Sequence, residues 1–445
     1  MSRYALVAVL CRTLLVVGGF MVPLAVRGQA VEQAPVVTLE EARRRAMSVD
    51  PDAVEATSRV ETAVWERRAA YANMFTPTVR AGVNYTHFSD PFFNFGTGAI
   101  SPNATSATVE ASYTLLGAGK YGNLKNARAS LESAEASETA ARFRTALATD
   151  DAYYAVLANG ELQKVAQDRL NRAQEQFGVA RARVLAGEAI ASDSLQLLLE
   201  VNRARLAMLS RDSALVASRL GLGRQIGLTG PADAAPIDTA LLPPLPITQE
   251  EAVAEMRERG PELLAARAAE RGAEAVVGAM REQYLPEITL GATAGAYDSE
   301  LFPSALSRTQ VAVTVSLPIW NAGQRELTVA RARADRNVAR AARRDSERAA
   351  AESMAQAYHG FVTARAGVEL ALVGVAVSGE NYRVQRARYR EGATTILDLL
   401  EAQVALSEAE ATLVQSRYAT RLALARIEAL LGRRIFENDG TNPND

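Results

Sequence analysis

The chain of 445 residues contains one module twice, and this internal repeat limits the folds that it can adopt. A glycine turn followed by a long segment without Gly or Pro runs from Gly392 to Gly432, and an equivalent unit lies 205 residues earlier, starting at Gly187. Other matched positions, at offsets of 204 to 210, are Thr38 and Thr248, Pro51 and Pro261, Gly119 and Gly323, and Tyr153 and Tyr358. Any fold must therefore contain two equivalent units.

The first 30 residues have the pattern of an export signal. Arg3 supplies the positive charge, an apolar run extends from Thr13 to Val26, and Gly28 to Ala30 offers a cleavage site with small residues. The only cysteine, Cys11, lies inside this segment, so we expect a mature chain without disulfides or thiolate metal sites. No later stretch approaches about 18 apolar residues, so we expect no helical membrane anchor in the mature chain.

Composition and motifs argue against several functional classes. The chain carries 49 Lys and Arg against 51 Asp and Glu, a balance that argues against nucleic acid as a partner. The two histidines, His87 and His359, are isolated, and the Gly-rich segments do not match phosphate-binding loops. No nucleophile, base and orienting group recur in a usable pattern. We therefore predict no enzymatic activity, no cofactor and no metal.

Each module is predicted to contain a helix, a β-hairpin, a long helix and a return helix. In the first module, 31–228, we expect helices over about 38–74, 121–186 and 192–226 and strands over about 78–88 and 106–116. In the second, 247–432, we expect helices over about 248–284, 324–391 and 396–431 and strands over about 287–297 and 309–320. Pro51 should break the first helix. A Pro- and Ala-rich linker, 229–246, joins the modules, and a polar tail, 433–445, follows them.

The four predicted strands alternate between apolar and polar residues over about ten positions, the length of a transmembrane β-strand. In the first strand Val79, Ala81 and Val83 share one face, while Arg80 and Asn84 share the other. Between the first two strands we expect a loop from Ser89 to Thr105. The export signal and the small apolar faces favour membrane insertion over the alternative, a soluble hairpin packed on a core.

The two long helices would each reach about 100 Å at about 1.5 Å per residue. Their seams are rich in alanine, as in a tightly packed coiled coil. The return helices are about half as long, so the helices that precede the hairpins must complete the wall. Gly360, Gly367 and Gly374 recur every seven residues on one face. This stripe is either a place where another helix or subunit packs closely or a tolerated bend in a long rod.

Four strands cannot close a barrel, and open strand edges are not tolerated in lipid. Chains that insert must therefore associate. Two chains would supply eight strands and a filled interior, whereas three would supply twelve strands and a water-filled lumen. A hollow helical cylinder requires the wider ring, so we expect a homotrimer.

The two module copies, together with the segments 392–403 (GATTILDLLEAQ) and 317–323 (LPIWNAG), resemble the TolC family of outer-membrane efflux channels over essentially the whole mature chain. The resemblance implies a mainly α protein with a 12-stranded transmembrane β-barrel in outer-membrane lipid and a long periplasmic α-helical barrel. It also implies a passive exit duct for small molecules that works with a periplasmic adaptor and an inner-membrane pump. Two alternatives remain: a duct for type I protein secretion, and a periplasmic coiled-coil scaffold or adaptor.

The resemblance also implies functional positions around the two turns. Asp398 and Glu401 correspond to the acidic residues that ring the periplasmic entrance, although acids near a helix N-terminus are also favourable for local reasons. The hairpin tips at Gly187 and Gly392 correspond to the adaptor contact.

The resemblance implies an entrance gate as well. Tyr389 and Asp193 occupy two of its positions, but Thr394 stands where the family's best-described gate has an arginine. An Arg–Asp pair is stronger than a Tyr–Asp hydrogen bond, so we expect either a weaker closed state or substitution by Arg388 or Arg390.

Overall fold

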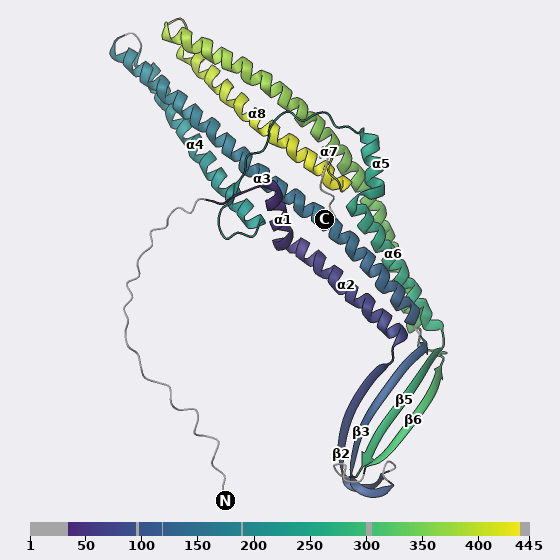
Figure 1. Cartoon of the computed structure of the whole chain (residues 1–445). Coiled ribbons are helices and arrows are strands. Elements are labelled where there is room, and N and C mark those ends of the chain that lie inside the picture. The colour runs from purple at the N-terminus through teal and green to yellow at the C-terminus, as the bar shows by residue number, and fades with distance from the viewer. Residues whose placement is uncertain (1–33, 95–97, 118, 188–189, 300–304, 437–445) are drawn as a thin grey trace, which may run out of the picture. The chain divides into compact units, whose positions relative to one another are not determined.

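The structure is a computed structural model that describes residues 34–94, 98–117, 119–187, 190–299 and 305–436 (Figure 1). The predicted export signal and the tail beyond residue 436 lie outside these residues. The first module contains β1 (Val36–Val37), α1 (Leu39–Val49), α2 (Pro51–Phe75), β2 (Thr78–Asn94), β3 (Ala99–Leu116), α3 (Lys120–Leu185) and α4 (Ala191–Gln225). After β4 (Asp233–Ala234), the second contains α5 (Gln249–Arg259), α6 (Pro261–Arg281), a 3-10 turn, η1 (Glu282–Tyr284), β5 (Glu287–Asp298), β6 (Leu306–Ser316), α7 (Gln324–Arg390) and α8 (Ile396–Leu431).

The helix before each hairpin is broken by a proline at its equivalent position. Pro51 and Pro261 are the first residues of α2 and α6, where a missing backbone N–H carries no penalty. Thr38 and Thr248 cap α1 and α5 by accepting hydrogen bonds from the backbone N–H three residues on, at 3.3 and 3.2 Å. The range 248–284, which the sequence predicts as one helix, is therefore α5, α6 and the short turn η1.

A tyrosine in each long helix ties that helix to its module's first residues. The hydroxyl of Tyr153, which is fully buried, donates to the carbonyl oxygen of Ala235 at 2.7 Å and lies 3.2 Å from the carbonyl oxygen of Val37. Its repeat equivalent, Tyr358, donates to the carbonyl oxygen of Ile247 at 3.3 Å. The predicted linker also contains an unpredicted strand, because β4 pairs in parallel with β1. The repeat is thus visible in matching side-chain contacts.

Strands β2, β3, β5 and β6 form one antiparallel sheet in that order. The predicted loop from Ser89 to Thr105 is wrong, because β2 continues to Asn94 and β3 starts at Ala99. Backbone pairing resumes beyond a register shift between His87 and Phe92, which sequence alternation does not reveal. At the other edge β6 ends at Ser316, short of the predicted residue 320, because Pro318 has no N–H to donate.

The sheet has one apolar and one polar face. The register places Val79, Ala111, Ala292 and Val311 in one row, and Arg80 opposite Glu110 on the other face. No helix among the described residues covers the apolar face, where the valines of β2 and β6 are 64% to 75% exposed. A soluble hairpin would pack this face against a core. The open face therefore favours the lipid-facing interpretation.

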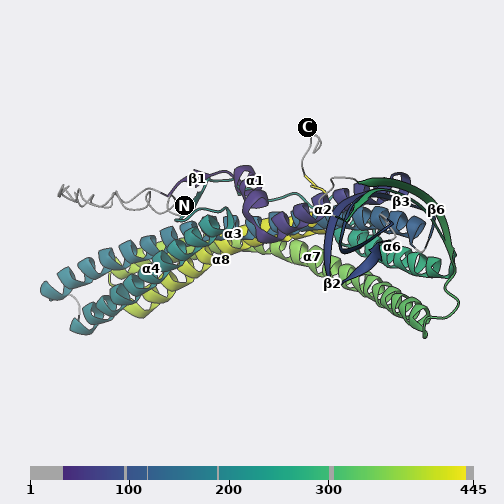
Figure 2. The same cartoon turned by 90° about the horizontal axis from the view of Figure 1, so that it is seen from below.

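The helices form a layer in which α3 is central. Toward the sheet the order is α2, α3, α6, α7, and toward the glycine turns it is α4, α3, α8, α7. The second helical hairpin's return helix, α8, ends where α6 begins. Figure 2 shows α1 and β1 on one face of this layer, where Arg43 of α1 makes a two-pronged ion pair with buried Asp150 of α3 at 2.6 and 2.5 Å.

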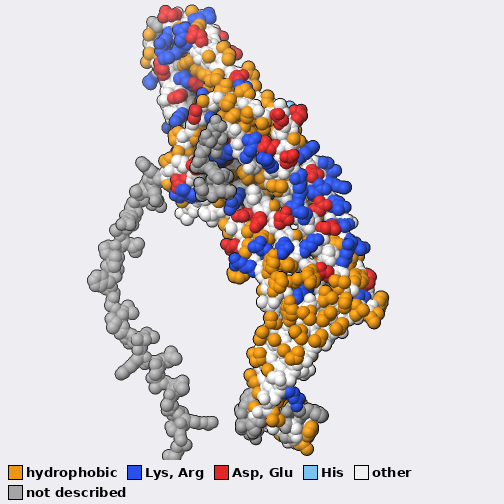
Figure 3. Space-filling view, turned by 45° about the vertical axis from the view of Figure 1, so that its right-hand side comes forward, with side chains coloured by type: hydrophobic (Ala, Val, Ile, Leu, Met, Phe, Trp, Pro, Cys, Tyr) orange, Lys and Arg blue, Asp and Glu red, His pale blue; other side chains and the backbone are white. Residues whose placement is uncertain are grey.

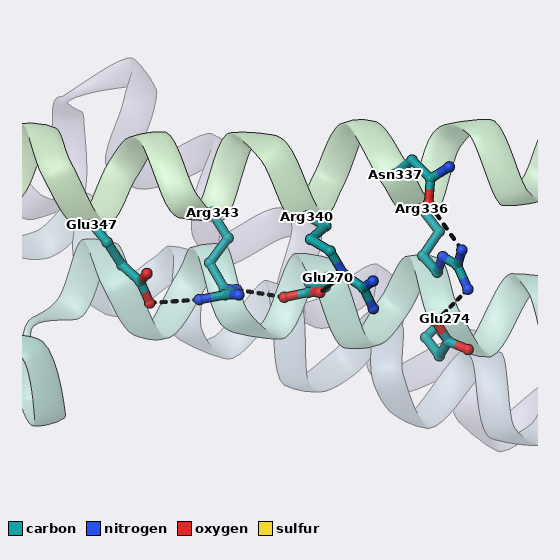
Figure 4. Close-up of polar contacts among 7 residues, drawn as sticks. All are labelled: Glu270, Glu274, Arg336, Asn337, Arg340, Arg343 and Glu347. Atoms are coloured by element: carbon teal, nitrogen blue, oxygen red, sulfur yellow. Dashed lines mark hydrogen bonds and ion pairs between the residues drawn. The ribbon is translucent and has the colours of Figure 1, made fainter.

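An ion-pair ladder joins α6 to α7 (Figure 4). Glu270 accepts hydrogen bonds from both Arg340 and Arg343, and these bonds hold the pKa of Glu270 below its usual range. Arg343 also pairs with Glu347 at 2.6 Å, and Arg336 with Glu274 at 3.5 Å. Figure 3 shows charged side chains gathered over the helices and a band of hydrophobic side chains over the sheet and the adjoining helix ends.

One expectation about membrane helices was wrong. Within the described residues, α7 contains an 18-residue window with a mean hydropathy of 1.6, long and apolar enough by composition to cross a membrane. Only 17% of that window is buried within the chain. The apolar surface lies at the free edge of the helical layer, so the window indicates an uncovered packing surface as readily as a membrane span.

Candidate functional site

The candidate site lies at the tips of the two helical hairpins, at the end of the helices far from the sheet (Figure 1). Gly187 and Gly392 close the last turns of α3 and α7 with φ angles of +76° and +72°, which side chains rarely allow. Their backbone N–H groups donate to the carbonyl oxygens of Val184 and Tyr389, both at 3.1 Å. The tips are therefore equivalent turns held by equivalent hydrogen bonds.

Tyr389 is buried between the two hairpins. Only 4% of it is exposed, and its ring packs among Leu197, Tyr382 and Leu399. Among the described residues its hydroxyl has no hydrogen-bond partner, so the expected Tyr389–Asp193 hydrogen bond is absent. Burial raises the pKa of Tyr389, and the nearby negative charge of Asp193 raises it further. The structure thus brings the two residues close without bonding them.

Arg183 of α3 is a residue of this site that the sequence analysis missed. Its Nη1 donates to the carbonyl oxygen of Tyr389 at 2.7 Å, and its guanidinium carbon lies 5.4 Å from the centre of the Tyr389 ring. One side chain of the first hairpin thereby holds the last turn of α7. The repeat could have revealed it, because Arg183 lies 205 residues before Arg388.

Among the described residues of one chain, neither Arg388 nor Arg390 makes a hydrogen bond or ion pair with Asp193. Arg388 donates to the carbonyl oxygen of Ala393 at 3.3 Å, within its own turn. Arg390 lies 3.3 Å from Glu175 of α3. Both cations bind locally or bridge to a different acid, whereas Arg183 contacts Tyr389.

Asp398 is the third residue of α8 and closes the cap of that helix. Its Oδ2 accepts hydrogen bonds from Thr395 Oγ1 at 2.6 Å, Thr394 Oγ1 at 2.9 Å and the Thr395 backbone N–H at 3.1 Å. These bonds lower the pKa of Asp398, with Thr395 as the largest cause. Thr394 therefore supports the carboxylate. Glu401 is exposed one turn further along. The local role of Asp398 is thus clear, and a ring of acids needs further copies of the chain.

The interface between the α3–α4 hairpin and the α7–α8 hairpin contains polar as well as apolar contacts. Arg172 of α3 pairs with Glu410 of α8 at 2.8 Å, and the Gln176 amide donates to the Tyr382 hydroxyl at 2.8 Å. Gln403 is fully buried, yet its amide has no partner among the described residues. A buried amide without a partner costs about 1–3 kcal/mol. This interface is therefore less stable than a fully apolar interface of the same area.

The described residues contain no group of three or more His, Cys, Asp or Glu that could hold a metal. His87 of β2 is paired with the Asn103 side chain at 2.7 Å. At the tips the described residues form glycine turns, ion pairs and the contact between Arg183 and Tyr389.

The family model described as "Outer membrane efflux protein" matches residues 42–228 and 252–433. The probable efflux pump outer membrane protein TtgC of Pseudomonas putida is 23% identical over 299 residues, which cover 65% of this chain and 60% of that relative. The outer membrane protein OprJ of Pseudomonas aeruginosa is 28% identical over 328 residues, covering 70% and 67%. The chain thus matches about 60% of the length of TtgC.

Solved structures show the same fold. The CmeC outer membrane channel of Campylobacter jejuni has a TM-score of 0.77 at 15% identity, covering 90% of this chain and 87% of CmeC. VceC of Vibrio cholerae has a TM-score of 0.74 at 19% identity, covering 89% and 96%. The chain belongs to the outer membrane efflux protein family and is an outer-membrane protein.

Proposed function

We propose that three copies of this chain form a passive exit duct for small molecules through the outer membrane. In this proposal a periplasmic adaptor and an inner-membrane pump deliver the cargo, and the chain catalyses no reaction. The observation that carries the proposal concerns the edges of the β-sheet and of the helical layer. In the described chain, each ends in two uncovered edges that differ from one another. Each layer is therefore complete only in a ring of copies.

The sheet supplies the first pair of edges. Within the described part of the chain, β2 and β6 each pair with a neighbour on one side only. In lipid each unpaired backbone group costs several kcal/mol, so both edges need partners. Because the edges differ, β6 of one copy can meet β2 of the next, and such a head-to-tail contact generates a ring. Three copies of four strands give twelve.

The helices supply the second pair of edges. On α7, Val362, Leu370, Val373 and Val377 are exposed at steps of three, four or eight residues. On α4, at the opposite edge of the layer, the exposed apolar residues include Leu195, Leu199, Leu206, Leu209, Val216 and Leu220. Such spacing is typical of a coiled-coil seam. Pairing α7 of one copy with α4 of the next would cover both seams and close a helical cylinder.

The polar face of the sheet suits the interior of such a ring. It carries Arg80, Glu110, Thr108 and Thr293, residues that favour water. The apolar face would then contact lipid on the outside. The uncovered apolar face also argues against the scaffold alternative, in which the strands would form a soluble domain.

The relatives' names favour small molecules over polypeptides as cargo. They describe an antibiotic efflux pump protein and a toluene efflux pump protein, both from Pseudomonas putida. Within this proposal Asp398 and Glu401 would ring the entrance, while Tyr389, Asp193 and Arg183 would hold it shut. The tips at Gly187 and Gly392 would contact the adaptor.

The test is the mass of the purified protein in detergent, measured by light scattering and corrected for bound detergent, together with membrane fractionation. Three chains in an outer-membrane particle are expected. Leu370→Glu, which places a charge on the α7 seam, should shift the particle toward smaller species. A wild-type monomer or dimer would refute the shared barrel and with it the duct.

A further inference from the structure

A cavity of about 350 Å³ opens where α8 ends and α6 begins. It lies between the two modules, with α3 on one side and α7 on the other. Its walls are mainly apolar and include Phe143, Leu147, Ala357, Gly360, Ala423 and Leu430. Ligand sites in proteins have this character: about 300–1,000 Å³, apolar walls and a few polar groups.

The helix ends explain why the cavity exists. Gly432 ends α8 in the left-handed region, with a φ of +72°, and Pro261 starts α6 beside it. Two helices that meet end to end leave a gap along their neighbours. Across the gap, α7 presents Gly360, and a Cβ built there would meet no atom within 4 Å. The glycine therefore leaves space that a side chain could occupy.

The surroundings of Gly360, Gly367 and Gly374 test whether another helix of the chain packs closely on this glycine stripe. No element of the described chain packs closely on Gly360 or Gly374, and at Gly367 the nearest atom to a built Cβ is 3.5 Å away. Close packing within the chain is therefore not the reason for the stripe. At Gly360 the missing side chain contributes to the cavity instead.

Charged groups line the cavity unevenly. Arg144 and Glu262 form an exposed ion pair at 3.3 Å and offset each other. Arg426 is exposed and makes no ion pair or side-chain hydrogen bond with any described residue. One positive charge therefore remains beside an apolar space. This combination favours a ligand with an apolar body and one negative charge.

The cavity opens on the face of the helical layer opposite to α5 and the linker that precedes it. Tyr358, which bonds the residues before α5, precedes Gly360 by two positions, and two residues correspond to a rotation of about 200° around a helix. α5 and the linker therefore do not cover Gly360.

We propose that this cavity is a binding site for a small amphiphilic organic anion. Its apolar body occupies the space between α3 and α7, and its carboxylate or sulfonate binds Arg426. The site is separate from the hairpin tips. It does not depend on the trimer being an export duct.

The probe is 8-anilinonaphthalene-1-sulfonate, an aromatic anion that fluoresces more strongly in an apolar site. Wild-type protein in a non-ionic detergent should give saturable fluorescence above the detergent background. Gly360→Leu should abolish the saturable part, because the leucine fills the cavity. This variant should fold, since the space is open and leucine has a higher helix propensity than glycine.

Gly374→Leu is the matched control, because it makes the same change on the same face of α7 outside the cavity. It should bind like the wild type. Arg426→Ala should weaken binding of the anion about tenfold while leaving N-phenyl-1-naphthylamine, an uncharged probe, unaffected. Equal saturable binding by the wild type and Gly360→Leu, or no saturable binding at all, would overturn the site. Equal weakening of both probes by Arg426→Ala would overturn its preference for anions.

Discussion

Arg183 should control how tightly the proposed entrance is closed. Its guanidinium donates a charged hydrogen bond to the Tyr389 carbonyl at 2.7 Å, worth about 1.5–3 kcal/mol. Its contact with the Tyr389 ring adds about 0.5–1 kcal/mol. Because Arg183 is partly exposed, solvent screening reduces the sum to about 2 kcal/mol. Arg183→Ala should therefore raise the ratio of open to closed entrances about 30-fold.

The assay is single-channel recording in planar bilayers, with open probability and conductance as readouts. Arg181→Ala is the matched control, because Arg181 is exposed on the same turn of α3 and makes no side-chain hydrogen bond or ion pair with a described residue. It should behave like the wild type. Arg183→Lys keeps the charge but loses the planar donor group, so it should lie between the wild type and Arg183→Ala.

An unchanged open probability in Arg183→Ala would refute this reasoning. It would mean that the contact is lost in the assembled channel or that it does not limit opening. A similar increase in Arg181→Ala would instead assign the effect to the overall charge of the tip.

Three further predictions concern stability and selectivity. Tyr153→Phe should lower the free energy of unfolding by about 1–3 kcal/mol, because it leaves the Ala235 carbonyl without its partner. Tyr358 is half-buried, so Tyr358→Phe should lower it less, and equal shifts in thermal midpoint would contradict this. Burial raises the pKa of Glu428 in α8, so the folded state binds its proton more tightly than the unfolded state does. The protonated carboxyl therefore stabilises the fold at low pH, and this stability is lost as the pH rises through the folded-state pKa. Glu428→Gln should lose less stability over that interval, and parallel melting profiles from pH 4 to 8 would show otherwise. Replacing Asp398 by Asn together with Glu401 by Gln should weaken cation selectivity if both acids ring the entrance, whereas unchanged reversal potentials would leave Asp398 with its capping role alone.

The sequence determined the features that depend on local periodicity and on the repeat. Alternation along β2 and β5 predicted which residues share a face, because side chains in a strand alternate with a period of two. The repeat offsets predicted equivalent turns at Gly187 and Gly392 and equivalent helix caps at Thr38 and Thr248. These features are set by residues within a few positions of one another, so a single sequence can reveal them.

The tertiary structure decided what lies beside what. Strand pairing beyond the bulge extended β2 through the predicted loop, and the rotation of α3 against α7 placed Arg183 on Tyr389, a residue 206 positions away. The same packing left a cavity beside Gly360. Such contacts depend on the relative rotation and axial shift of long helices. The periodicity of each helix specifies which residues form its face, but the mutual fit of several helices decides which partner that face meets.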